Sequence, residues 1–477
     1  MFRRLLLTTS TVLWLWGAYA LYSATVTPQL QPPPEAVRID PRTFSEDFGD
    51  QLTEADSAFA RKYLHDAPWI DPPANAPDEL QPYQIRLGSQ LKIFSIKIES
   101  LPAGRELHFR PFAMLIASKE KSPTGEPAEP VAIIAEEAVI KFANAIDLQS
   151  SPGRIVGGQF KGKVTLRGPD NLSLTGDTFF FEEQIQSQSS ILYSDSLVKF
   201  TYGPHSGRGT QFNVEFTRLK GEIPSDLPAI SGIDKFWINR DVHLELVDTR
   251  KSAKQLPQGH ARSRRGDMLL VDAQGRMTLD MRQNRLTLED QVRLVHPDAR
   301  GKQDSVDCEL LVLDLINPDA GKQVAADPDD DRFSNWFPRR LELGSFTATG
   351  NPEKLVRINS PQYSLWGDMR SLQYDLRNRR AILLEEKRDG VHIVQGPYDI
   401  RSPEIQIHHG SDYELLTVDC LRPGRIDSRG DQRTPIHAEW QKSMSKHPSK
   451  EIPEQDVVEL HGQAKLSPPL EKMSLAA

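Results

Sequence analysis

Cysteine is scarce in this sequence, and its scarcity limits the chemistry of the chain. Only two cysteines, Cys308 and Cys420, occur among 477 residues, and they stand far apart in the sequence. Two such residues supply neither a zinc site nor a disulfide framework. A single disulfide between them is an alternative that the sequence leaves open.

Patterns that mark catalytic or metal sites are missing as well. No Ser-His-Asp, Cys-His or paired-carboxylate arrangement stands out, so we expect no catalytic residue, no metal, no cofactor and no enzyme activity. Gly157–Lys163 is similar to the start of a phosphate-binding loop, but Val164 stands where serine or threonine is required. We interpret this segment as a hairpin turn. His408 and His409 are adjacent in an expected strand and point to opposite faces, so they do not share one metal ion, and we expect both to be surface histidines.

A strong positive charge is also missing. Acidic residues outnumber basic ones, 66 to 58, and the formal net charge is −8. Because nucleic-acid-binding proteins concentrate basic residues, we expect no nucleic-acid partner.

Helical periodicity is rare between residues 83 and 410, where apolar residues alternate with polar ones instead. Val198, Phe200 and Tyr202 show this period of two, which is typical of half-buried antiparallel strands. Gly168–Asn171 and Asp272–Gly275 contain residues that accept a positive φ, so we expect hairpin turns there. The sequence therefore predicts an all-β fold.

A strand-turn-strand unit recurs three times, around Leu192, Leu286 and Ile382, at nearly equal intervals. In the first unit we expect separate short strands at Ile191–Asp195 and Val198–Tyr202, followed by a glycine-rich turn. A long internal period indicates serially arranged modules. We expect three β-modules at residues 83–225, 226–320 and 338–425.

The N-terminus predicts export. Arg3 and Arg4 precede the uncharged stretch Leu5–Tyr22, which at ~1.5 Å per residue just spans a hydrocarbon core of ~30 Å. Residues 1–23 are therefore expected to be a membrane anchor, or alternatively a signal peptide cleaved after the small-x-small motif Ala18–Ala20. Both interpretations place the remainder of the chain across the membrane.

Two further regions flank the expected modules. Residues 24–82 form a proline-rich stalk in which apolar residues at helical spacing predict one amphipathic helix over Ser45–Leu64. This helix either packs on the sheet as a lid or docks a partner. Residues 426–477 predict a polar tail that ends in a short strand pair.

Several short segments share a rhythm of glycine, alternating apolar residues and aspartate. They are Gly162–Gly168, Leu174–Asp177, Phe179–Glu182, Leu192–Val198, Gly207–Gly209, Ala348–Pro352, Leu372–Asp375 and Leu460–Ala464. This rhythm resembles the sequence pattern of the periplasmic lipopolysaccharide-transport family with OstA-like domains. An N-terminal anchor followed by such a domain is similar to the layout of the LptC-like members of that family. The chain is much longer than one such domain.

The resemblance implies serial open β-jellyroll (β-taco) modules of antiparallel strands, tethered to the inner membrane by one helix, with the bulk in the periplasm. It implies transfer or bridging of a lipid, such as a lipopolysaccharide-like glycolipid, in an apolar groove, and edge-strand pairing with other β-jellyroll envelope proteins. Without the anchor the protein is expected to be free in the periplasm. The alternative is a non-enzymatic scaffold of the cell envelope.

The alternating apolar positions of the strands are the candidate lining of such a groove, although an ordinary sandwich core would use the same residues. They are Val164, Leu166, Phe179, Phe181, Val198, Phe200, Phe212, Val214, Leu286, Leu288, Val292, Leu294, Leu372, Tyr374, Ile382 and Leu384.

Overall fold

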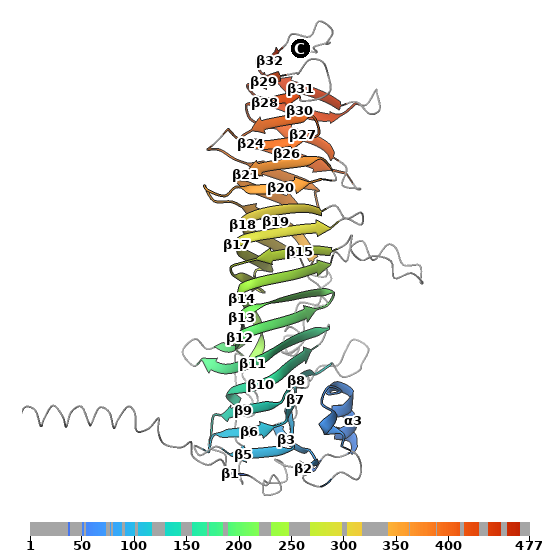
Figure 1. The fold of residues 1–477 in the computed structure, drawn as a ribbon, viewed down its shortest axis with the longest axis vertical. Helices are drawn as coiled ribbons and strands as arrows, with labels where there is room; N and C mark the ends of the chain where they lie inside the picture. The colour runs from blue at the N-terminus through green and yellow to red at the C-terminus, as the bar shows by residue number, and fades with distance from the viewer. Residues whose placement is uncertain are drawn as a thin grey trace, which may run out of the picture.

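The strands of the chain form one elongated stack, as the computed structural model shows (Figure 1). The structure describes residues 37–38, 50–51, 54–72, 77, 80–87, 91–100, 104–116, 129–144, 155–168, 171–184, 189–218, 230–247, 268–297, 303–316, 342–361, 363–387, 389–410, 415–428, 437–449 and 456–467. These residues contain 32 strands, joined edge to edge into one sheet whose neighbours are antiparallel throughout. The predicted all-β, antiparallel fold is confirmed.

The sheet is doubled into two layers that face each other across an apolar core. Layer one contains the short strands β2 (Asp50–Gln51), β3 (Tyr83–Leu87), β4 (Leu91–Ser95), β7 (Phe112–Ile116), β8 (Val131–Ala135), β15 (Met268–Ala273), β20 (Val356–Ser360), β21 (Leu365–Met369), β24 (Val391–Gln395), β25 (Tyr398–Ser402), β28 (Gly424–Ser428), β29 (His437–Trp440) and β32 (Lys465–Ser467). Layer two contains β1 (Val37–Arg38), β5 (Lys97–Ser100), β6 (Glu106–Arg110), β9 (Glu137–Phe142), β16 (Met277–Asp280), β19 (Glu342–Thr349), β22 (Ser371–Asp375), β23 (Arg380–Leu384), β26 (Glu404–His409), β27 (Leu415–Cys420), β30 (Ser443–Pro448) and β31 (Asp456–His461).

Seven long strands belong to both layers because each bends at its middle. They are β10 (Ile155–Gly168), β11 (Leu172–Gln184), β12 (Ser189–Tyr202), β13 (His205–Arg218), β14 (Ile230–Val247), β17 (Arg285–Pro297) and β18 (Gln303–Ile316). One half of β10 pairs with β8 of layer one, and the other half pairs with β9 of layer two. The register shifts at the bend, and Lys163, Gln211, Asp241, Asp290 and Gln291 have positive φ near these shifts. Such bulges bend a strand sharply, so they form the corner edge at which the two layers meet.

These bulges explain two corrections to the expectations from sequence. The expected hairpin turn at Gly157–Lys163 is wrong, because the segment lies inside β10 and its Gly162 and Lys163 form the bulge. Likewise, the two short strands expected before and after Asp195 are halves of one strand, β12, with a register shift between Ser194 and Leu197. A break in the apolar alternation therefore marked a bend, and not the end of a strand.

Of the two expected hairpin turns, one is confirmed. Gly168–Asn171 joins β10 to β11, which pair directly from Gly168 to Leu172. Asp272–Gly275 is not a hairpin turn, since β15 and β16 do not pair with each other. Both pair instead with β14 and with β17, one in each layer, so this segment crosses the corner edge.

The C-terminal part uses short hairpins that alternate between the layers. The chain makes β20–β21 in layer one, then β22–β23 in layer two, and continues in this order to β30–β31. β31 and β32 occupy the positions of the expected terminal strand pair, but they pair with β30 and β29 and not with each other. Short strands also occur in the segment expected to be only a polar tail, because cross-layer packing supports them.

In the second and third of the three sequence units, the recurrence corresponds to a repeated turn in layer two. Oδ1 of Asp280 accepts the backbone N–H groups of Arg282 and Gln283 between β16 and β17. Oδ1 of Asp375 accepts the two equivalent N–H groups between β22 and β23. Such aspartate-capped turns are a common local motif. The turns place Leu286 and Ala381 at equivalent, inward-facing positions, each the second residue of the strand that follows. Ile382, which the sequence pattern aligns with Leu286, stands one residue further and is half-buried on the outer side.

The core between the layers is one cluster of buried side chains that extends from Ile85 to Met444. Strand pairing continues from β13 to β14 and from β18 to β19, where the module boundaries were expected. The division into three modules stays a prediction.

Helix α3 (Glu54–Tyr63), followed by the short 3-10 helix η2 (Pro68–Ile70), covers the outer face of layer one at its N-terminal end (Figure 1). Ala60, Leu64 and Ile70 pack there against a second cluster that includes Phe94 and Leu115. The predicted amphipathic helix is therefore confirmed, and it packs on the sheet.

Its predicted start at Ser45 is wrong, because Asp50–Gln51 forms β2 and pairs with β3. In this segment the pairing of β2 with β3 outweighs the tendency of apolar residues at helical spacing to form a helix. The expected anchor or signal at residues 1–23 lies outside the described residues. Among the residues that are described, no helix combines the length and apolar character needed to cross a membrane.

Candidate functional site: an apolar strip along the open edge

The layers meet at the corner edge and are separate at the opposite edge, where the hairpin turns lie. Turns at Gly203–Pro204 and Gly396–Pro397 close hairpins of layer one, and turns at 281–284 and 376–379 close hairpins of layer two. Among the described strands, no pairing joins the layers at this second edge. We refer to it as the open edge.

Half-buried apolar side chains that pack against the core follow the open edge. Each lies close to the open-edge end of its strand, and together we call them the apolar strip: Leu166, Phe200, Ile233, Leu246, Leu269, Leu279, Leu315, Leu343, Leu365, Tyr374 and Tyr398. The strip receives residues from both layers and from β10 to β25. Apolar surface that is continuous and partly exposed commonly marks a binding site.

Aromatic rings bring the layers into contact at the strip. The ring of Phe200, in the layer-one half of β12, lies 5.5 Å from that of Phe236, in the layer-two half of β14. Phe200 has room to lie inward because Gly207 faces it. A Cβ on Gly207 would lie 2.4 Å from Cζ of Phe200 and 2.8 Å from Leu244. A glycine in a strand often permits such a close approach.

Most of the predicted lining residues point between the layers and are covered by protein. The buried ones are Val164, Phe179, Phe181, Val198, Phe212, Val214, Leu286, Leu288, Val292, Leu294 and Leu372. Leu166, Phe200 and Tyr374 are half-buried and belong to the apolar strip. The region around the buried residues is thus filled by side chains, and their role in lining a groove stays a prediction.

In β23 the residues that point between the layers are the neighbours of the two predicted lining residues, Ile382 and Leu384. Ala381 and Leu383 belong to the core, with exposures of 5% and 0%. Ile382 and Leu384 are half-buried and, because alternate residues of a strand point to opposite faces, lie on the outer side. The continuous apolar run Ala381–Leu384 gives no alternation from which the register could be read.

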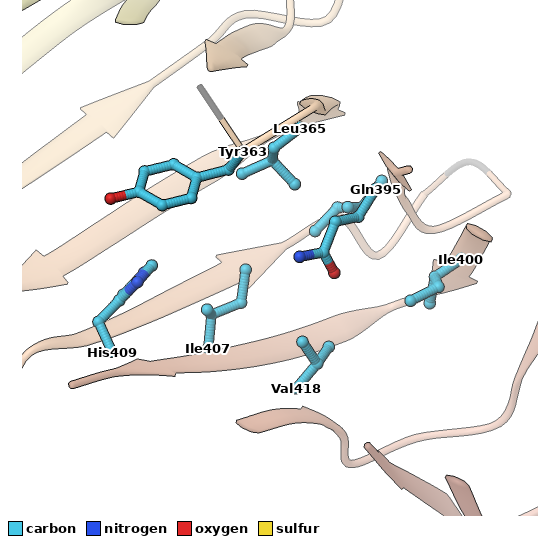
Figure 2. Close-up of a pocket in the computed structure, with 8 residues that line it drawn as sticks. Tyr363, Leu365, Gln395, Ile400, Ile407, His409 and Val418 are labelled. Carbon is cyan, nitrogen blue, oxygen red and sulfur yellow. The ribbon is translucent and has the colours of Figure 1, made fainter. Parts of the chain in front are cut away.

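A cavity opens between the layers in the C-terminal part of the strip (Figure 2). Its volume is about 400 Å³, counted with the space open to solvent. Layer one contributes Tyr363, Leu365, Ile393, Gln395 and Ile400, and layer two contributes Ile407, His409 and Val418. Tyr363 and Leu365 face His409, Ile407 and Val418 across the gap, as Figure 2 shows.

The polar side chains among these lining residues are Tyr363, Gln395 and His409, and each stands at the open-edge end of its strand or in the turn beside it, which we call the rim. The expectation of two surface histidines at 408 and 409 therefore fails for His409, which lines the cavity and lies 6.1 Å from the ring of Tyr374. The backbone N–H of His409 donates to the carbonyl of Arg379, 3.0 Å away. Sequence reasoning missed this cavity because its residues come from five short strands and one turn with no shared motif.

Titratable groups gather on the outer faces instead. On layer two, His108 lies between Glu99 and Glu137, with Nε2 3.1 Å from the Glu137 carboxylate. The hydrogen bond from Lys97 is the main cause of the lowered pKa of Glu99. Burial opposes ionisation of Glu137, but the charges of His108 and Arg110 outweigh it and lower its pKa. This network ties β5, β6 and β9 together across the layer.

The cysteines offer no reactive thiolate. Cys308 and Cys420 are both buried and free, so the disulfide that the sequence left open is not formed. Burial raises the pKa of each thiol to about 12. Because the thiolate is the nucleophile and the metal ligand, these side chains are inert near neutral pH. Within the described ranges, no group of three His, Cys, Asp or Glu residues is placed to hold a metal ion.

One outer-face pair predicts a dependence of stability on pH. Nδ1 of His437 lies 2.5 Å from Oδ1 of Asp427, and this hydrogen bond is the main cause of the raised pKa of His437. A raised pKa stabilises the fold below the unfolded value of about 6.5, and the benefit is lost as pH rises through the folded value. Because the imidazole is 42% exposed, we expect a loss of only ~0.5 kcal/mol or less.

Urea unfolding between about pH 6 and pH 8 measures this loss. The variant Asp427→Asn, which keeps the shape of the pair without its charge, should show a smaller change over this interval. An equal change in both proteins would contradict the assignment to His437.

The chain matched no model of a known protein family and no curated protein. The geometry of the open edge therefore carries the functional argument.

Proposed function

We propose that this protein transfers or bridges a lipid between membranes of the cell envelope, holding the acyl chains at the open edge between its two layers. The apolar strip is the observation that carries this proposal, since it extends over most of the stack and reaches the cavity lined by Leu365. The resemblance to the lipopolysaccharide-transport family favours a lipopolysaccharide-like glycolipid as cargo and an open β-jellyroll as the finer description of the fold.

Burial of acyl chains supplies the driving force. Each methylene group that leaves water for an apolar site gains ~0.8 kcal/mol. Side chains fill the interior beneath the strip, where Val198 is 0% exposed, so a chain binds at the strip and separates the layers there. The bulges at the corner edge keep the layers joined while the open edge widens.

Membrane attachment and partners complete the proposal. The segment Leu5–Tyr22 tethers the chain to the inner membrane, with the strands in the periplasm, or exports it there if it is cleaved. The terminal strands β1, β2, β31 and β32 each have one unpaired edge among the described strands. Unpaired edges accept further strands, which fits end-to-end contact with other β-jellyroll envelope proteins.

A photoreactive phenylalanine analogue tests the proposal directly. Placed at Phe200 in the apolar strip, it should form adducts with lipid in intact cells, which mass spectrometry identifies. Phe180 provides the matched control, because it lies on the outer face and stacks on Tyr193 with ring centroids 5.0 Å apart. We expect adducts at Phe200 and none at Phe180. Folded protein without lipid adducts at Phe200 would contradict the proposal.

The packed interior favours a second candidate, a structural scaffold without cargo. Val198, Leu288 and Leu311 are each 0% exposed, as in an ordinary sandwich core. A scaffold predicts that a charge at Phe200 impairs fold and assembly together. Lipid transfer instead predicts that a substitution at Phe200 can abolish lipid binding while the protein stays folded.

A further inference from the structure

A lysine lies between the layers beside the cavity. Lys446 in β30 is 8% exposed, and it pairs in register with Val418, which lines the cavity. Residues directly opposite in an antiparallel pair share a face, so both side chains point inward. Nζ of Lys446 lies 4.9 Å from the ring centroid of Tyr398 in the facing layer.

The surroundings of this ammonium group favour a fixed position. The ring of Tyr398 attracts a cation through its π face, and burial restricts the lysine side chain. Tyr398 is the register partner of Gln395, a rim residue of the cavity. The positive charge therefore stands at one end of an apolar space, close to its polar rim.

This arrangement matches an amphiphile with a negative head. Ile393, Ile400, Ile407 and Val418 provide an apolar wall on both layers, along which an alkyl chain lies once the layers separate, as at the rest of the apolar strip. A phosphate is attracted by a partly desolvated ammonium group. The amide of Gln395 can donate to oxygen atoms between head and chain.

We propose that the cavity binds one alkyl chain of a phosphate-bearing amphiphile, with the phosphate beside Lys446. The inference rests on the proposed lipid function and adds the place at which a charged head is recognised. It assigns the C-terminal part of the open edge to head-group selection, and the rest of the apolar strip to chain burial.

Calorimetric titration of the full chain with decyl phosphate, below its micelle concentration, tests the head-group contact. Lys446→Met keeps an unbranched side chain that is only one atom shorter and removes its charge. It should weaken decyl phosphate binding by ~10-fold, the effect of losing one charge-assisted contact, and leave binding of uncharged decyl glucoside unchanged. Thermal unfolding should show that the Lys446→Met protein is folded at the temperature of the titration, so that a change in affinity reports the removed charge.

The control is Lys442→Gln, which removes an exposed lysine at the corner edge and should change neither affinity. The cavity itself is tested by Leu365→Trp, because Leu365 is half-buried at its mouth and a larger ring there can fill it. In the unchanged protein, affinity should rise about fourfold for each methylene added from octyl to decyl phosphate. The Leu365→Trp protein should lose most of this dependence.

Equal weakening of both ligands by Lys446→Met, or no weakening of either, would overturn the head-group assignment. Chain-length dependence that survives Leu365→Trp would overturn the placement of the chain. Either result, together with lipid adducts at Phe200, would leave the proposed lipid function standing. No adducts at Phe200 together with tight decyl phosphate binding would contradict the transfer function and retain this local site.

Discussion

Leu288→Asp is expected to unfold the central strands of the protein. Leu288 is 0% exposed and lies between Met277 and Leu311, its register partners in β16 and β18. The substitution removes a buried leucine, at a cost of ~2–5 kcal/mol, and adds the desolvation of a carboxylate. The sum approaches the ~5–15 kcal/mol that stabilises a typical domain.

Thr287→Asp is the matched control, because Thr287 precedes Leu288 in β17, points to the other face and is half-exposed. Circular dichroism and urea unfolding should show strand structure close to normal in the control and largely lost in the Leu288 variant. If the two variants had the same urea unfolding midpoint within error, the space between the layers would tolerate a charge. This result would contradict a core from which water is excluded.

Leu64→Asp is expected to detach helix α3 while the stack of strands stays folded. Leu64 follows the helix, is 1% exposed and packs in the second cluster with Phe94 and Leu115. A carboxylate in this contact loses at least the ~2–5 kcal/mol of a buried leucine. This is sufficient to undock one short helix, because an isolated helix of this length is unstable in water.

Hydrogen exchange measures the effect region by region. Amides of Glu54–Tyr63 should exchange rapidly in the Leu64 variant, whereas those of β10–β14 should keep their protection. Ala58→Asp places the same charge on the exposed face of the helix and should leave protection unchanged. Uniform loss of protection over the strands would show that the helix supports the whole stack.

The strands were predictable from the sequence because their alternation reflects burial on one face. β13 illustrates this, with Phe212, Val214 and Phe216 buried and polar residues between them. The bends were not predictable, because Lys163, Gln211 and Asp290 are ordinary polar residues whose positive φ depends on pairing with both layers. Local sequence cannot distinguish such a bulge from a turn.

The candidate site was predictable only in part, for a related reason. Phe200 was identified because it follows the alternation, and the structure places it at the open edge. Gln395 and Lys446 were not predicted, and His409 was predicted to be a surface residue, because each stands in a short strand that mixes polar and apolar residues. Their proximity arises from hairpins that alternate between layers, so residues of one site are separated in the sequence by strands of the other layer.

The alternation of hairpins also constrains how such a molecule changes in length. One hairpin adds two strands to a single layer, which would then overhang its partner by about 10 Å at ~4.8 Å per strand. The overhang would expose the apolar inner face of that hairpin to water. Insertions and deletions in relatives of this chain should therefore come as two consecutive hairpins, one for each layer, and any chain with an odd number would need another cover for its uneven end.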